Sequence, residues 1–342
     1  MKLLKSKNIV YVFLLILCSI TACKKNANEA PEAKADVYVV GYTFKNHEYA
    51  TCWKNGTEII LDSADNIYSN ANAIAVNNNE VYIAISGSST SNYYTAGYWH
   101  NGSITRISSD PSGFAIANAI AVDNNDVYIA GIGLDGGWRA AYYWKNTTPF
   151  LISGVIDYSA GSAVAVSGND VYIAGSNASI VTCWKNGVPT KITDLSMVAY
   201  ANGIAVNGND VYVVGYVSGY NGAPSKATYW KNGIATKLAD ASSVASAIVI
   251  SGGDVYIAGS STTNNGEFVA TYWKNGVPVK LGDGNIPSNA TSIAVNGSNV
   301  YVAGLLGKNA AYWKNGVPVI LHNDQSGLGA NSYALGIAVI PH

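Results

Sequence analysis

The sequence predicts an all-β protein, a seven-bladed β-propeller with four antiparallel strands in each blade. Three observations lead to this prediction: internal repetition, four strand-like runs in every repeat, and one repeat divided between the two ends of the chain. The composition agrees, because 35 Gly, 24 Tyr and only 12% charged residues among 342 residues are typical of short strands joined by polar turns.

Two markers define the repeat. A Val-Tyr pair begins at Val37, Val81, Val127, Val171, Val211, Val255 and Val300. A tryptophan, usually within Tyr-Trp-Lys-Asn-Gly, recurs at Trp53, Trp99, Trp144, Trp184, Trp230, Trp273 and Trp313. Successive Val-Tyr pairs are 40 to 46 residues apart, and residues 35–342 number 308, which is seven times 44. A repeat of this length is the size of a propeller blade.

Each repeat contains four short runs that read as strands, and the sixth repeat is a clear example. Its runs are 247–250, 255–259, 270–273 and 278–281, each rich in β-branched or aromatic residues and bounded by turn residues. Asn275 and Gly276 separate the last two runs and favour a tight hairpin. The Ala-rich first run is predicted to be innermost, and the repeated Tyr and Trp rings are predicted to fill the core between blades.

The two ends of the chain share one repeat. The first repeat starts at Asp36 without the Ala-Ile-Ala-Val run that precedes every other Val-Tyr pair, and an additional run of this kind stands at 336–339. We therefore expect the C-terminal strand to complete the first blade and close the ring, which removes the exposed sheet edges that an open array would keep.

Connection lengths distinguish the two faces of the predicted disc. The spacing from the inner-strand Ile or Val to the next Val-Tyr is always seven residues, and from the tryptophan to the Leu or Ile that closes the outer strand it is always eight. The other two connections vary, from 13 to 19 and from 10 to 16 residues. Because the strands alternate in direction, the constant turns share one face, the uniform face, and the variable connections share the other, the variable face.

The variable face is the predicted binding face, because recognition usually sits on loops held by a rigid scaffold. Trp138 and Arg139 are the strongest candidates, since Trp138 is the one tryptophan outside the repeat and Gly136 and Gly137 precede the pair. The full set of candidate ligand-binding residues is His47, Tyr93, Tyr94, Trp138, Arg139, Tyr220 and Phe268. Aromatic residues also stand in the links between blades, where Tyr68, Phe114 and Tyr158 are expected to pack.

The uniform face carries lysines that precede Asn-Gly, and we expect them to be solvated charges. The acids before each Val-Tyr pair are expected to be turn acceptors, with too few ligands in any turn for a calcium site. Cys52 and Cys183 replace tyrosines in the same repeat position, three repeats apart, and are expected to be small buried side chains without a disulfide.

The N-terminus differs from the repeats. Lys2, Lys5 and Lys7 precede an apolar run over 9–20, which indicates a signal peptide over 1–22. The residues Ile20, Thr21, Ala22 and Cys23 resemble the lipobox of bacterial lipoproteins. That resemblance implies a lipid anchor on Cys23, followed by a flexible tether over 23–35 and the propeller over 36–342, with the membrane as a partner.

Each repeat combines four motifs in order: Val-Tyr-x-Ala-Gly, Ala-x-Tyr-Trp-Lys-Asn-Gly, Leu and Ala-Ile-Ala-Val. With the lipobox before it, this repeat resembles that of uncharacterised propeller lipoproteins of Bacteroidota. This resemblance covers 36–342 and implies a location in the cell envelope, at the outer membrane of a Gram-negative bacterium. It implies no particular activity.

Two functions are compatible with the sequence. The first is a non-catalytic module that binds a glycan or a protein on its variable face; the alternative is a hydrolase or lyase that acts on polysaccharide. No metal, cofactor or catalytic motif is predicted, and the acids Asp65, Asp110, Asp135, Asp157, Glu267 and Asp283 are scattered. From Ala35 onward, 14 Lys and Arg stand against 19 Asp and Glu, a net charge of −5, which argues against nucleic-acid binding.

Overall fold

The computed structural model describes ten stretches of the chain, 34–62, 68–88, 94–108, 113–153, 159–177, 179–194, 196–218, 223–239, 241–322 and 332–342. The chain divides into two compact parts, Met1–Lys34 and Ala35–His342, and the second contains all of the described strands. The predicted signal peptide, the anchor Cys23, nearly all of the tether, and the candidates Tyr93 and Tyr220 lie outside the described residues.

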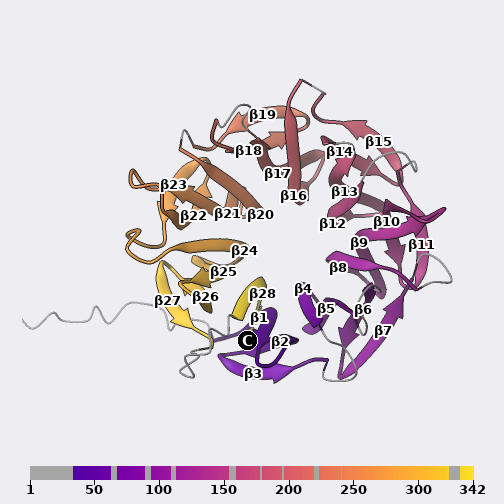
Figure 1. The fold of residues 1–342 in the computed structure, drawn as a ribbon, viewed down its shortest axis with the longest axis horizontal. Helices are drawn as coiled ribbons and strands as arrows, with labels where there is room; N and C mark the ends of the chain where they lie inside the picture. The colour runs from indigo at the N-terminus through magenta and orange to yellow at the C-terminus, as the bar shows by residue number, and fades with distance from the viewer. Residues whose placement is uncertain are drawn as a thin grey trace, which may run out of the picture. The chain divides into compact units, whose positions relative to one another are not determined.

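The described chain is all-β, with 28 strands. The strands form four-stranded antiparallel sets arranged side by side around a central axis (Figure 1). We call each set a unit. Unit I contains β28, β1, β2 and β3. Each later unit contains the next four strands in chain order, so that unit II is β4–β7 and unit VII is β24–β27. The predicted strands of the sixth repeat are confirmed as β20–β23. The first three are longer than predicted, and β23 begins and ends one residue earlier, at Val277 and Lys280.

The strands have four positions within a unit. The inner strands are β28 (Ser332–Pro341), β4 (Tyr68–Asn77), β8 (Ile116–Asp123), β12 (Ala160–Ser167), β16 (Val198–Asn207), β20 (Ser243–Ser251) and β24 (Ser288–Asn296). The second strands are β1 (Ala35–Phe44), β5 (Glu80–Ser88), β9 (Asp126–Asp135), β13 (Asp170–Asn177), β17 (Asp210–Ser218), β21 (Asp254–Thr262) and β25 (Asn299–Leu306). The third strands are β2 (Glu48–Lys54), β6 (Tyr94–His100), β10 (Trp138–Lys145), β14 (Ile180–Lys185), β18 (Lys226–Lys231), β22 (Phe268–Lys274) and β26 (Asn309–Lys314). The outer strands are β3 (Thr57–Ile60), β7 (Ser103–Ile107), β11 (Thr148–Leu151), β15 (Val188–Lys191), β19 (Ile234–Lys237), β23 (Val277–Lys280) and β27 (Val317–Ile320).

The two ends of the chain meet in unit I. The C-terminal strand β28 pairs antiparallel with β1, from Ala35 opposite Pro341 to Thr43 opposite Ser332. The predicted pairing of the last strand with the first is therefore confirmed. The expectation that every blade is a separate four-stranded sheet is wrong for units I and II. They form a single eight-stranded mixed sheet, because Tyr68 at the start of β4 pairs in parallel with Glu48 at the start of β2.

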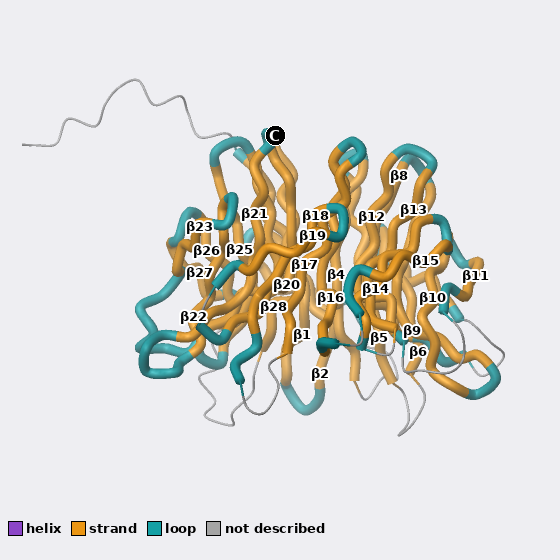
Figure 2. The backbone as a smooth tube through the Cα atoms, turned by 90° about the horizontal axis from the view of Figure 1, so that it is seen from above, coloured by secondary structure: helices purple, strands orange, loops and turns teal. Residues whose placement is uncertain are grey.

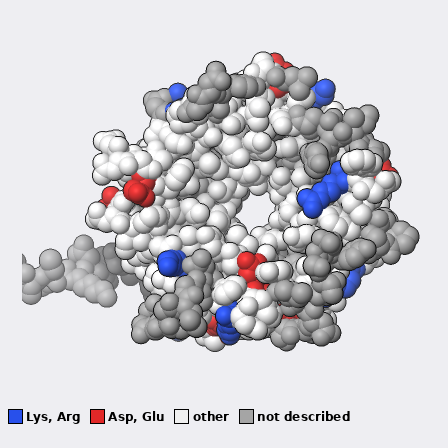
Figure 3. All heavy atoms as spheres, in the orientation of Figure 1, with Lys and Arg blue, Asp and Glu red and all other residues white. Residues whose placement is uncertain are grey.

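The strands run between two ends that carry different connections (Figure 2). The first turn of units II to VII and the third turn of every unit are two-residue hairpins, in which Asn and Gly adopt positive φ, as at Asn275 (51°) and Gly276 (83°). The C-terminal residue lies at this end, where His342 Nε2 is 3.3 Å from Asp36 Oδ1. Figure 3 shows an opening at the centre of the ring of sheets.

Each inner strand contains a β-bulge at the same position in its pairing with the second strand. In unit VI the register shifts between Ala245 and Ala247, with Ser246 as the additional residue. A Cβ atom on Gly259, opposite the bulge, would lie 2.0 Å from the carbonyl oxygen of Val244, which explains the recurring glycine of the Val-Tyr-x-Ala-Gly motif. Unit II has Ile85 at the corresponding position.

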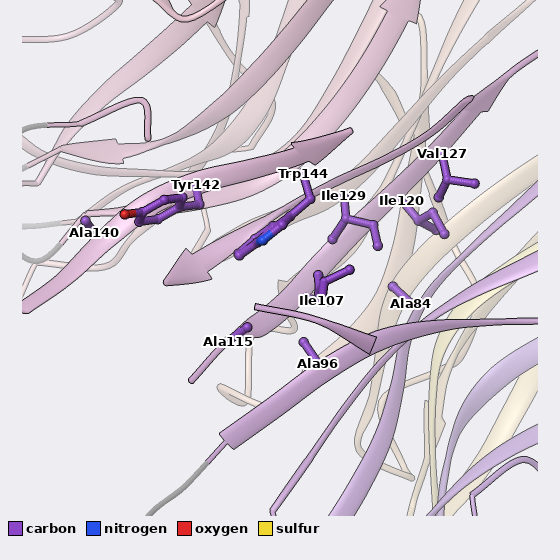
Figure 4. Packing of buried hydrophobic residues seen from close by; sticks show 11 residues of the cluster. Ala84, Ala96, Ile107, Ala115, Ile120, Val127, Ile129, Ala140, Tyr142 and Trp144 are labelled. Atoms are coloured by element: carbon purple, nitrogen blue, oxygen red, sulfur yellow. The ribbon is translucent and has the colours of Figure 1, made fainter. Parts of the chain in front are cut away.

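The core lies between neighbouring units, as predicted. Six of the seven repeated tryptophans are at most 2% exposed, namely Trp53, Trp144, Trp184, Trp230, Trp273 and Trp313, and Trp99 is partly buried. Figure 4 shows the Trp144 indole beside Ile129 and directed toward Ile107 of the preceding unit. The buried apolar residues of the described chain fall into seven clusters, and clusters such as that of Trp144 combine residues of neighbouring units.

Candidate ligand-binding surfaces

The uniform face is held by a network that repeats from unit to unit. In unit VI, Asn275 Oδ1 accepts a hydrogen bond from the Val255 amide (2.9 Å), and Asn275 Nδ2 donates to Asp254 Oδ1 (2.8 Å). Lys274 Nζ lies 2.8 Å from Asp254 Oδ2 and 5.2 Å from the centre of the Tyr256 ring. The hydrogen bonds from Lys274 and Asn275 lower the pKa of the Asp254 carboxyl.

The lysines are exposed, as expected of solvated charges, and several of them also form an ion pair with an acid. The same Asp–Lys–Asn arrangement joins Asp36 to Lys54 and Asn55, Asp126 to Lys145 and Asn146, Asp170 to Lys185 and Asn186, and Asp210 to Lys231 and Asn232. Unit II uses Glu80 and His100 (3.0 Å), and unit VII uses Asn299 and Asn315 (2.7 Å). The prediction that these acids are turn acceptors is confirmed.

The variable face has a different character. Most of the described atoms on the face seen in Figure 3 belong to uncharged residues. Large apolar side chains such as Trp138 and Phe268 are exposed in its connections. Trp138 is 65% exposed at the first position of β10, where it pairs with Asp135 across the turn formed by Gly136 and Gly137. Both glycines have positive φ, the conformation that a tight hairpin turn requires, and the indole beyond the turn is left exposed.

Arg139 lies on the other side of β10, because successive residues of a strand point to opposite faces. Its guanidinium lies 5.7 Å from the centre of the Phe114 ring, and Tyr94 meets the same ring edge-on at 6.1 Å. The Ala115 amide donates to the Tyr94 carbonyl (3.0 Å), which holds the link before β8 against β6. The structure thus joins Tyr94 and Arg139 through buried Phe114, and it separates the predicted Trp138–Arg139 pair.

The remaining described candidates lie elsewhere on the ring. The His47 ring stacks on Tyr49 at 3.9 Å in the connection between β1 and β2, and Phe268, 42% exposed, lies at the start of β22. The predicted residues therefore do not converge on one site. Of the link aromatics, Phe114 packs as expected, whereas Tyr68 is 51% exposed, so the packing expected of Tyr68 is wrong.

Two grooves lie between neighbouring units. One, of about 380 Å³, lies between units VI and VII and is lined by Val244, Ser246, Ser260, Phe268, Pro287, Ser288, Asn289, Ala290, Thr291 and Leu305. The other, of about 1170 Å³, lies between units IV and V and includes Trp230, Asp194 and the lysines Lys191, Lys226 and Lys237. Apart from Phe268, no residue of the first groove was foreseen from the sequence, because its small polar residues carry no motif.

The two cysteines are free and buried, as predicted. Burial raises the pKa of the Cys52 thiol to about 12 and that of the Cys183 thiol to about 11, so neither is a ready nucleophile at neutral pH.

In the described part of the chain, no group of three or more His, Cys, Asp and Glu side chains could hold a metal ion. The same residues include no helix with the length and apolarity that a membrane crossing needs. A comparison with protein-family models finds none that matches this chain, and a search of curated proteins finds no similar sequence.

Proposed function

We propose that this chain is a lipid-anchored envelope protein, a closed seven-bladed β-propeller that binds a neutral glycan on its variable face without transforming it. Closure is supported by the contacts of β28, which pairs with β1 and also touches the inner strands β24 and β4 on either side. The four-stranded sets, with units I and II joined by one parallel residue pair, supply the seven blades of this proposal.

The observation that carries the glycan proposal is Trp138, a 65% exposed indole that directly follows a two-residue hairpin turn. Sugar rings present C–H faces that stack on aromatic rings, and their hydroxyls require neutral polar partners. The mostly uncharged residues described on the variable face suit a neutral ligand better than a charged one (Figure 3).

The experiment is a binding screen with the full-length protein in detergent micelles, against xylan, mannan, chitin oligosaccharides and arabinogalactan. We expect at least one of them to bind, and Trp138→Ala to weaken that binding about tenfold. Ile234→Ala is the matched control, because Ile234 is 74% exposed and directly follows a hairpin on the uniform face. Absence of binding by all four glycans contradicts the proposal, and release of shorter sugars supports the alternative of a polysaccharide hydrolase or lyase.

The proposed anchor is tested separately, by metabolic labelling with an alkyne-bearing fatty acid. We expect the wild-type protein to carry the label and to sediment with membranes, and Cys23→Ala to lose both properties. Labelling that persists in Cys23→Ala contradicts the anchor and leaves the glycan proposal untouched.

A further inference from the structure

Four pairs of neighbouring units are joined near the variable face by the additional residue of the inner-strand bulge. Asn72 Nδ2 donates to the Ala117 carbonyl of the next unit (2.7 Å), and Asn118 and Asn202 repeat this bond to the carbonyls of Gly161 (2.9 Å) and Ala245 (2.8 Å). In unit VII the hydroxyl of Thr291 donates to the Ala334 carbonyl (2.8 Å). We call this contact the bulge latch.

Units IV and VI have serine at the latch position, Ser162 and Ser246, and unit I has Leu335. None of these three side chains makes a latch bond within the described residues. The groove of about 380 Å³ lies at the unlatched junction between units VI and VII, and Ser246 lines it. The larger groove, between units IV and V, is lined by residues of β14, β15, β17, β18 and β19 and not by the latch position Ser162.

The junction between units II and III shows what is absent between units VI and VII. The Ser86 hydroxyl accepts a hydrogen bond from the Ala117 amide (2.9 Å). The latch bond from Asn72 goes to the carbonyl of the same residue, Ala117. Ser260 is the counterpart of Ser86 and Ala290 is the counterpart of Ala117. Among the described residues, Ser246 and Ser260 make no side-chain hydrogen bond, and both line the groove. Two hydroxyls are thus left for a ligand.

The other walls of this groove specify the kind of ligand. Phe268 is 42% exposed, Val244, Pro287 and Leu305 are apolar, and none of the lining residues is charged. Asn289 also lines the groove, and its Oδ1 atom is buried without a partner in the described part. A volume of about 380 Å³ lies within the range of small-ligand pockets, about 300–1,000 Å³.

We propose that the groove between units VI and VII is a second binding site, which takes one or two sugar residues of a neutral glycan. One face of the sugar ring packs on Phe268, and its hydroxyls exchange hydrogen bonds with Ser246 and Ser260. The inference shares its ligand class with the proposed function but uses residues remote in sequence from Trp138.

The decisive variant is Ser246→Asn, which installs the latch residue found in three other units and closes the groove. The probes are methyl β-glucoside, methyl α-mannoside, methyl β-galactoside and N-acetylglucosamine, measured by calorimetry and ligand-observed NMR on the full-length protein in micelles. We expect at least one probe to bind the wild type, and Ser246→Asn and Phe268→Ala each to weaken it at least tenfold. Ser246→Ala leaves the groove open, so we expect a smaller loss.

Ser162→Asn is the matched control, since it makes the same change at the unlatched junction between units IV and V and should leave this binding unchanged. Unfolding temperatures equal to or above that of the wild type show that Ser246→Asn is folded. Equal affinity in Ser246→Asn and wild type, or no binding of any probe, overturns the groove site. Loss of glycan binding in Trp138→Ala with full binding in Ser246→Asn also overturns the groove, while it supports the proposed function.

Discussion

The two faces of this protein are built from the same strands but differ in how completely their polar groups are paired. On the uniform face, the asparagine between the third and outer strands accepts a hydrogen bond from a backbone amide in six units. In five units an aspartate bonds both that asparagine and a lysine. On the variable face, rings such as Trp138 are exposed, and hydroxyls such as Ser246 and Ser260 have no described partner.

This difference indicates a division of labour. Hairpins that satisfy their own hydrogen bonds can hold the strands in register from one face, so the other face can vary in length and sequence at little cost to folding. Substitutions on the two faces should therefore affect different properties: stability on the uniform face, and binding with modest stability changes on the variable face.

Among the substitutions that test this comparison, Asn275→Ala is expected to change the free energy of unfolding most. It removes the acceptor of the Val255 amide and the donor to Asp254, and it places alanine at a φ of 51°. Loss of an exposed hydrogen bond costs about 0.5–1.5 kcal/mol and the left-handed conformation about 1–2 kcal/mol. We expect the free energy of unfolding, measured in urea, to fall by about 1.5–3.5 kcal/mol, with glycan binding unchanged at temperatures where the variant is folded.

Asn275→Gly separates the two causes, because glycine tolerates positive φ but provides no side-chain bonds. It should lose less stability than Asn275→Ala. A change below about 0.5 kcal/mol in Asn275→Ala, the size of an ordinary surface substitution, contradicts the role given to the uniform face.

Much of the fold could be predicted from sequence because it is repeated. Positions such as Val255 and Trp273 recur at constant spacing, and the alternation of Asn-Gly hairpins with apolar runs locates the strands. The bulge latch could not be predicted, because Asn72 and Ser246 occupy the same repeat position and differ only in reach across a junction that exists once the units are packed.

The candidate site was predicted less well, for a related reason. Exposure of Trp138 follows from its place outside the repeat, but the contact of Arg139 with Phe114 depends on which side of β10 each residue occupies. Groove residues such as Ser260 have no chemical signature in sequence. Their proposed role depends on the absence of hydrogen-bond partners, which can be seen only once the units are packed together.

A smaller effect is expected from Asn202→Ser on the variable face. It removes the latch bond to the Ala245 carbonyl and imitates the unlatched junctions of Ser162 and Ser246. The cost of one partly buried hydrogen bond is about 1 kcal/mol. Urea unfolding should show this loss, and amide hydrogen exchange of Ala245 and its neighbours should become faster. Unchanged exchange there means that the latch does not hold the junction closed.

The smallest effect at neutral pH is expected for a fivefold variant in which Asp36, Asp126, Asp170, Asp210 and Asp254 are replaced by asparagine. Unit VII already has this arrangement, because Asn299 accepts a hydrogen bond from Asn315 (2.7 Å). The five ion pairs lie on the solvent-exposed uniform face, where such pairs contribute little. We therefore expect the urea midpoint at pH 7 to differ only slightly between the variant and the wild type.

The stability of the wild type and that of the fivefold variant are expected to differ at acid pH. Hydrogen bonds from lysine and asparagine lower the pKa of all five carboxyls. A carboxyl whose pKa is lower in the folded state binds fewer protons there than in the unfolded state, so its stabilisation is complete above the ordinary value of 3.8 and is lost as the pH falls below it. The wild type should lose stability steeply below that pH, and the fivefold variant should lose less. If the two proteins lose stability in parallel as the pH falls, the five carboxylates do not stabilise the folded state, and the hydrogen bonds of the asparagines alone stabilise the uniform face.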